Sequence, residues 1–73
     1  MNLPETVAHG NTRYFPKSTD MFVRQWCSAR GLTLDELATQ VGVSRLNLGL
    51  ILKGVDPVTT ALERKLRTVI DGN

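Results

Sequence analysis

From residue 18 onward, apolar positions return every three or four residues, which is the spacing of one face of an α helix. The first such run lies between Ser18 and Gly31, and a glycine in the left-handed conformation can close a helix at its end. The start of this run offers three capping residues, Ser18, Thr19 and Asp20. The apolar face of this first predicted helix carries Phe22, Val23, Trp26 and Cys27.

The next two helices have sharper start signals. Thr33 followed three residues later by Glu36 predicts a capping box, in which each side chain satisfies the other residue's free backbone N–H. Gly42 ends this second helix after a short run, and Ser44 can cap a third helix over about 45–53. The apolar stripes of the two helices are Leu34, Leu37, Ala38 and Val41, then Leu48, Ile51 and Leu52.

A fourth helix is predicted to begin at Pro57, directly after Asp56, because proline at the first helical position loses no hydrogen bond. Gly72 ends this helix. Its charged side carries Glu63, Arg64, Lys65 and Arg67, and its apolar side carries Val58, Leu62, Leu66, Val69 and Ile70.

The first seventeen residues show neither a helical nor an alternating apolar period, and Pro4, Gly10 and Pro16 interrupt them. We therefore predict an irregular N-terminal arm over 1–17, followed by one domain over 18–73. No segment has the pattern of a strand, and no internal repeat is present. The predicted fold class is all-α, a bundle of four to five short helices.

Composition narrows the classes of function. The chain has 73 residues, a net charge of +2, and no apolar run near the roughly twenty residues that a membrane-spanning helix needs. The first ten residues lack the basic start and apolar stretch of a signal peptide, so we expect a cytoplasmic protein. Cys27 is the sole cysteine and is interpreted as core packing, and His9 has no metal-ligating cluster around it. We expect no enzyme, cofactor, metal or small-molecule ligand.

The informative stretch is TLDELATQVGVSRLNLGLILKG, residues 33–54. Two short helices are separated by a tight turn at Gly42, Ala38 is small where the helices should approach, and Val43 can fill the gap between them. A turn of this kind leaves the outer face of the second helix projecting from the domain. That face can enter a groove about 12 Å wide, the width of the DNA major groove.

The segment LATQVGVSRLNLGLILKG resembles the helix-turn-helix core of the lambda-repressor and Cro-like family. The likeness rests on Leu37-Ala38, Gly42-Val43-Ser44 and Lys53-Gly54 at the family's spacing, and it covers about residues 19–71. It implies a lambda-repressor-like bundle with residues 44–53 as the recognition helix. The family commonly begins the preceding helix with a glutamine that contacts phosphate, whereas this chain has Leu34.

The resemblance implies roles for individual residues. Arg45 would read a guanine with its guanidinium fork, and Asn47 would bond an adenine or a phosphate. Ser44 at the helix start and Thr33 would lie near phosphates. Leu46 and Leu50, with Gly49 between them, either touch thymine methyl groups or pack under the arm or in a dimer contact.

Further cations are candidates for phosphate contact. Lys53 and Arg30 stand at helix ends, where each either contacts a phosphate or complements the helix dipole. Arg13 and Lys17 in the arm either follow the DNA backbone or belong to a tail that folds onto the domain, with Tyr14 and Phe15 covering the core or a partner.

The leading hypothesis is a sequence-specific regulator of transcription, a repressor that binds double-stranded DNA as a homodimer. Two or three base-reading side chains give little specificity alone, and dimers of this type read palindromic half-sites about 34 Å apart. Small stand-alone regulators of this kind resemble Cro-type phage proteins, restriction-modification controllers and anti-CRISPR-associated autoregulators, which repress promoters by occupying them. The dimer candidates on the last helix, which also suit the monomer core, are Leu62, Leu66, Val69 and Ile70.

The alternative is a protein-binding module, such as an antitoxin, that uses the same fold to bind a protein partner. Leu46 and Leu50 on the outer face favour this alternative, whereas Arg45, Asn47 and Lys53 favour DNA. The dependence of duplex affinity on salt separates the two, because only a DNA-binding protein loses affinity steeply as salt rises.

Overall fold

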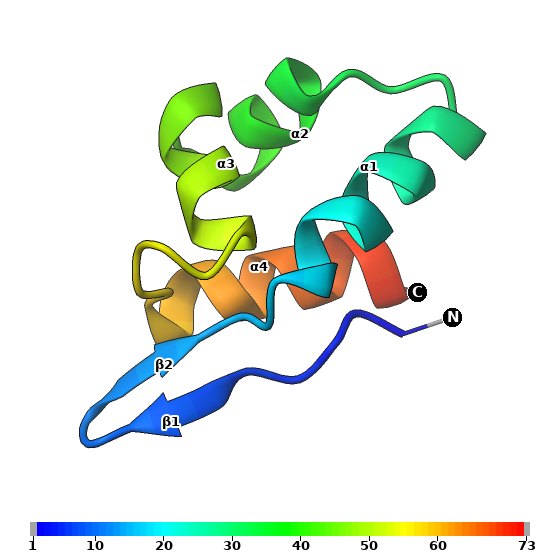
Figure 1. Ribbon diagram of the computed structural model, residues 1–73. Coiled ribbons are helices and arrows are strands. Elements are labelled where there is room, and N and C mark those ends of the chain that lie inside the picture. Colours follow the sequence, from blue (N-terminus) through cyan, green and yellow to red (C-terminus); the bar gives the residue numbers. More distant parts are fainter. Residues whose placement is uncertain (1, 73) are drawn as a thin grey trace.

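The computed structural model describes residues 2–72, which form four α helices and one two-stranded antiparallel sheet (Figure 1). The four-helix part of the prediction is confirmed, but the chain is not all-α. None of the helices within residues 2–72 combines the length and apolar composition needed to cross a membrane. The elements are β1 (Val7–His9), β2 (Thr12–Tyr14), α1 (Ser18–Ala29), α2 (Leu34–Val41), α3 (Arg45–Leu52) and α4 (Thr60–Asp71).

The predicted irregular arm is wrong, because residues 7–14 form a β hairpin. The turn consists of Gly10 and Asn11, with Gly10 at a left-handed φ of 64°, and it joins strands that pair Val7 with Tyr14 and His9 with Thr12. A glycine–asparagine pair is a hairpin signal. Each strand is only three residues long, which is too short for an alternating pattern to appear in the sequence.

The rest of the N-terminal segment folds back onto the helices. Leu3 and Phe15 are both buried in the core, and the Leu3 N–H donates to Asp71 Oδ1 at 2.8 Å. Arg67 donates to the carbonyls of Leu3 and Pro4. These contacts hold the two ends of the chain side by side, at the end of the molecule opposite the hairpin (Figure 1).

The helix starts were predicted with mixed success. The capping box is present, because the Thr33 hydroxyl accepts from the Glu36 N–H and the Glu36 carboxylate accepts from the Thr33 N–H. The predicted caps of the first helix are wrong, because α1 already includes Ser18 and follows Lys17 without a side-chain cap. Thr19 is fully buried instead, and its N–H donates to the carbonyl of Pro16.

The fourth helix begins three residues later than predicted. The Val58 N–H donates to the Arg13 carbonyl at 2.9 Å, so the segment before α4 runs extended along β2. Thr59 is the N-cap, and its hydroxyl accepts from the Leu62 N–H. Pro57 is therefore part of the link rather than the first helical residue, because a pairing with a distant strand replaces the local start signal.

One hydrophobic core joins all four helices and the N-terminal segment. Leu37, Leu48, Leu52 and Leu66 are fully buried, and Cys27 lies in this core as predicted. Burial raises the pKa of the Cys27 thiol above its usual value, because the thiolate would lose its water. Three of the four dimer candidates, Leu62, Leu66 and Ile70, also face this core, so they support the single chain, and Val69 is half-buried.

Candidate nucleic-acid interface

The turn between α2 and α3 fixes the position of the third helix. Gly42 has a φ of 80°, and the next residue, Val43, donates its N–H to the carbonyl of Ala38 at 3.0 Å. Ser44 then caps α3 by accepting the Asn47 N–H at 3.1 Å. Ala38 is almost completely buried where the two helices meet. The chain therefore turns sharply from one helix to the next, as the sequence predicts.

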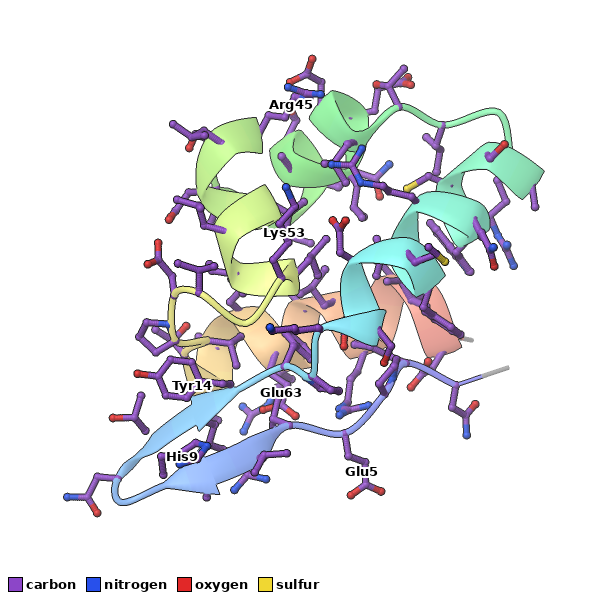
Figure 2. All side chains as sticks on the ribbon, in the orientation of Figure 1. Glu5, His9, Tyr14, Arg45, Lys53 and Glu63 are labelled. Atoms are coloured by element: carbon purple, nitrogen blue, oxygen red, sulfur yellow. The ribbon has the colours of Figure 1, made fainter. Side chains whose placement is uncertain are left out.

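The two faces of α3 differ sharply in exposure. Its inner face is buried against the core and consists of Leu48, Ile51 and Leu52. On its outer face Arg45, Leu46 and Asn47 are exposed, and 74% of Leu46 is accessible to solvent. Within residues 2–72, no other segment covers this part of the helix. Figure 2 shows Arg45 at the end of α3 far from the hairpin and Lys53 at the nearer end.

The middle of this outer face is less exposed than its first turn. Gly49 is half-buried, and a Cβ added to it would have no heavy atom within 4 Å, so space lies open above the helix there. Leu50 is half-buried, and its carbonyl accepts the N–H groups of Val55 and Asp56. The two candidate leucines thus differ, because Leu46 stands out in solvent and Leu50 is partly enclosed.

A shallow hollow runs along this face of α3. Its lining contains most of the predicted base-reading residues together with two residues from neighbouring helices: Arg24, Leu34, Arg45, Leu46, Gly49, Leu50 and Lys53. Leu34 is mostly buried here, so it fills space where the resembled family carries a polar phosphate contact. Arg24 was not predicted. It pairs with Asp20 at 3.1 Å on α1, and it also belongs to the lining of the hollow beside α3.

Only some of the residues that were predicted to contact phosphate lie near the outer face of α3. Lys53 is exposed at the end of α3, and Ser44 at its start keeps a hydroxyl proton to donate. Thr33 is engaged in its capping box, where its hydroxyl lies 3.1 Å from the Glu36 carboxylate. Arg30 lies elsewhere. Its guanidinium stacks over the ring of Trp26 at 4.2 Å and borders a different hollow, between α1 and the end of α4.

The two candidate cations of the arm have different surroundings. Arg13 donates to the Thr6 hydroxyl at 2.6 Å and lies 3.9 Å from the Glu63 carboxylate, so it ties the hairpin to α4. Arg13 is therefore not among the side chains of the α3 face. Lys17 is exposed, and it lines a second hollow together with Lys53 and the hairpin.

His9 and Tyr14 contact each other edge to face, with ring centroids 5.7 Å apart (Figure 2). Across the described part of the chain, no three His, Cys, Asp or Glu side chains gather closely enough to hold a metal ion.

The surface around α3 combines arginine, lysine, amide and aliphatic groups. These groups can bind anions, base edges and methyl groups.

Comparison of the chain with protein-family models, with curated proteins and with solved structures finds no match in any of the three. The function is therefore inferred from the residues around α3 and from the resemblance of their sequence to the lambda-repressor and Cro-like motif.

Proposed function

We propose that this protein binds double-stranded DNA in a sequence-specific manner by laying the outer face of α3 in the major groove. The observation that carries the proposal is the open outer face of a helix whose inner face is wholly buried. Arg45, Leu46 and Asn47 are exposed on its first turn, while Leu48 is completely buried. An exposed arginine, asparagine and leucine at the start of a projecting helix match the three kinds of chemistry that the major groove displays.

The dimensions of α3 fit this role. An α helix with its side chains is about 10–12 Å in diameter, which matches the roughly 12 Å width of the groove, and the eight residues of α3 extend about 12 Å along its axis. Arg45 would donate its N–H groups to the two acceptors of a guanine, O6 and N7, which discriminates against other bases by about 1–3 kcal/mol. Asn47 would bond an adenine, and Leu46 would contact a thymine methyl group. The missing side chain of Gly49 lets the helix axis come close to the bases.

A homodimer acting as a repressor is part of the same proposal. One α3 with two or three reading side chains discriminates too weakly among the many competing sites of a genome, and two copies on a palindrome double the recognised length. Because Leu62, Leu66 and Ile70 serve the core of one chain, the dimer contact would lie on other side chains. Occupation of a promoter, including the protein's own, would then block transcription.

The test is selection of bound duplexes from a random library by the full chain. The proposal predicts a recovered palindrome whose half-site centres lie about 34 Å apart, or a multiple of that distance. It also predicts an affinity for this palindrome that falls steeply with salt, because phosphate contacts release counterions. Recovery of no preferred sequence, together with no duplex binding at low salt, would refute it.

A protein-binding module is the second candidate, and the exposure of Leu46 favours it. A leucine that is 74% accessible on a projecting helix is an anchor for a protein partner as much as for a thymine methyl group. Replacing Leu46 with Gln separates the two functions. A protein interface loses its anchor entirely, whereas DNA binding loses preference at one position and keeps its dependence on salt.

A further inference from the structure

The hairpin has two faces with different surroundings. Successive residues of a strand point to opposite sides, so Arg13 lies on one face and its neighbour Tyr14 on the other. The Arg13 face is turned toward Thr6 and Glu63 of the protein itself. The opposite face, with Val7, His9 and Tyr14, borders an open groove rather than the core.

This groove lies between the hairpin and the end of α3. The hairpin supplies one wall, the link Phe15-Pro16-Lys17 forms the floor, and Lys53 and Gly54 supply the other wall. The link and the end of α3 are close together, because a Cβ on Gly54 would lie only 2.6 Å from the carbonyl oxygen of Phe15. The hairpin is also held in place, since the segment before α4 pairs with β2. The groove is therefore a fixed feature of the fold.

The charged side chains that line this groove are both cationic. Lys17 and Lys53 are both exposed at the groove, and no carboxylate belongs to its lining. Among the described residues, neither lysine is engaged in a salt bridge, in contrast to Arg13, Arg24 and Arg67. Tyr14 and His9 are further residues with polar groups in the lining. Two unpaired ammonium groups with neighbouring polar side chains suit phosphodiester groups.

The groove also continues the α3 surface. Lys53 lines both this groove and the hollow along the outer face of α3, so the two are joined at that residue. Figure 2 shows Lys53 at the end of α3 nearer to the hairpin, which carries His9 and Tyr14. A duplex lying along the outer face of α3 would pass beyond Lys53 toward the hairpin.

We propose that the groove between the hairpin and α3 is a second DNA-binding element, in which Lys17 and Lys53 hold the phosphate backbone flanking the base pairs read by α3. This inference rests on the proposed function and extends it. The hairpin contributes to affinity and to the length of the site rather than to base preference. The lysines act as point charges on flexible stems, so they bind phosphates without selecting a sequence.

The experiment uses the full chain, its selected duplex, and a Lys17→Gln variant, which removes the charge and keeps most of the side-chain stem. Lys17 makes no side-chain cap to α1, so the fold should persist, and circular dichroism checks this. An Arg64→Ala variant is the control, because Arg64 is exposed and lies in a hollow made of α4 residues alone. Affinity is measured as a function of salt on the selected duplex and on a scrambled duplex.

The proposal predicts that Lys17→Gln makes the slope of log affinity against log salt shallower by about 0.9 for each lost phosphate contact, or about 1.8 for the homodimer. The loss of affinity relative to the wild type is then roughly twelvefold larger at 50 mM than at 200 mM salt, equally on both duplexes, while Arg64→Ala matches the wild type. Methylphosphonate substitution of single flanking phosphates should weaken the wild type and leave Lys17→Gln unaffected at one position. An unchanged slope in Lys17→Gln, with Arg45→Ala still losing base preference, would overturn the proposed DNA-binding role of the groove and leave the proposed function intact. Absence of duplex binding by the wild type would overturn both.

Discussion

Replacing Gly54 with alanine tests the closeness of the hairpin link to the end of α3. Gly54 has a φ of 78°, a left-handed conformation that costs an L-residue about 1–2 kcal/mol. The new Cβ would also lie 2.6 Å from the Phe15 carbonyl oxygen, which belongs to the backbone and cannot rotate away. Forced shifts of this kind cost about 1–3 kcal/mol, so the total destabilisation should be about 2–5 kcal/mol.

Gly31→Ala is the matched control. Gly31 has a similar φ of 67°, but its added Cβ would have no heavy atom within 4 Å. It should therefore lose only the conformational part, about 1–2 kcal/mol. The difference between the two variants isolates the contact with Phe15.

The assay is urea denaturation of both variants and the wild type, followed by fluorescence of Trp26, the only tryptophan in the chain. The free energy of unfolding of Gly54→Ala should lie below that of Gly31→Ala by about 1–3 kcal/mol. In a thermal melt, each kcal/mol of this difference would lower the Tm by roughly 4–8 °C for a domain of this size. Equal destabilisation of the two variants would show that the link does not pack against the end of α3. The proposed groove between the hairpin and α3 would then be wrong.

Two more predictions concern residues of α3 and α1. Gly49→Ala should raise the free energy of unfolding by about 0.5–1 kcal/mol, because alanine favours the helix and its Cβ meets open space. The same methyl group should weaken duplex binding, and a variant that gains stability while keeping full affinity would argue against close approach of α3 to the bases. The Cys27 thiol, whose pKa burial raises, should react with iodoacetamide at pH 8 far more slowly in the folded protein than in urea. Equal rates in the two states would contradict its place in the core.

Features set by near neighbours in the chain were predictable from the sequence. The Thr33–Glu36 capping box, the left-handed Gly42 and the Ser44 cap all depend on side chains and backbone within a few residues, and all three occur as predicted. The inner face of α3 was likewise predictable, because burial of Leu48 follows the helical period.

Features set by distant contacts were not predictable in this way. The start of α4 depends on pairing of Val58 with Arg13, forty-five residues earlier, which overrides the Asp56-Pro57 signal. The hairpin strands are each three residues long, β1 is exposed and β2 is only partly buried, so a hydrophobic period could not mark them. The Gly10-Asn11 turn was the one local signal for them, and Pro4 and Pro16 on either side of it favoured an irregular interpretation.

The candidate site shows the same division. Most of the candidate residues on α3 line one hollow along a single helix face, and this grouping follows from their spacing alone. The cations outside α3 depend on partners elsewhere in the fold: Arg30 lies over Trp26, and Arg13 binds Thr6 beside Glu63. Charge in the sequence does not reveal whether such a partner is near, so Arg13, Arg30 and Arg24 could not be assigned.

The most direct test of the central claim is to repeat the selection of random duplexes with Arg45→Ala in place of the wild type. If the exposed first turn of α3 lies against base pairs, the variant should recover the same palindrome with preference lost at one base pair in each half-site, a reduction of about 1–3 kcal/mol in discrimination there. Arg64→Ala should recover the unaltered palindrome. Recovery of the complete wild-type palindrome by Arg45→Ala would contradict the placement of this face of α3 against DNA.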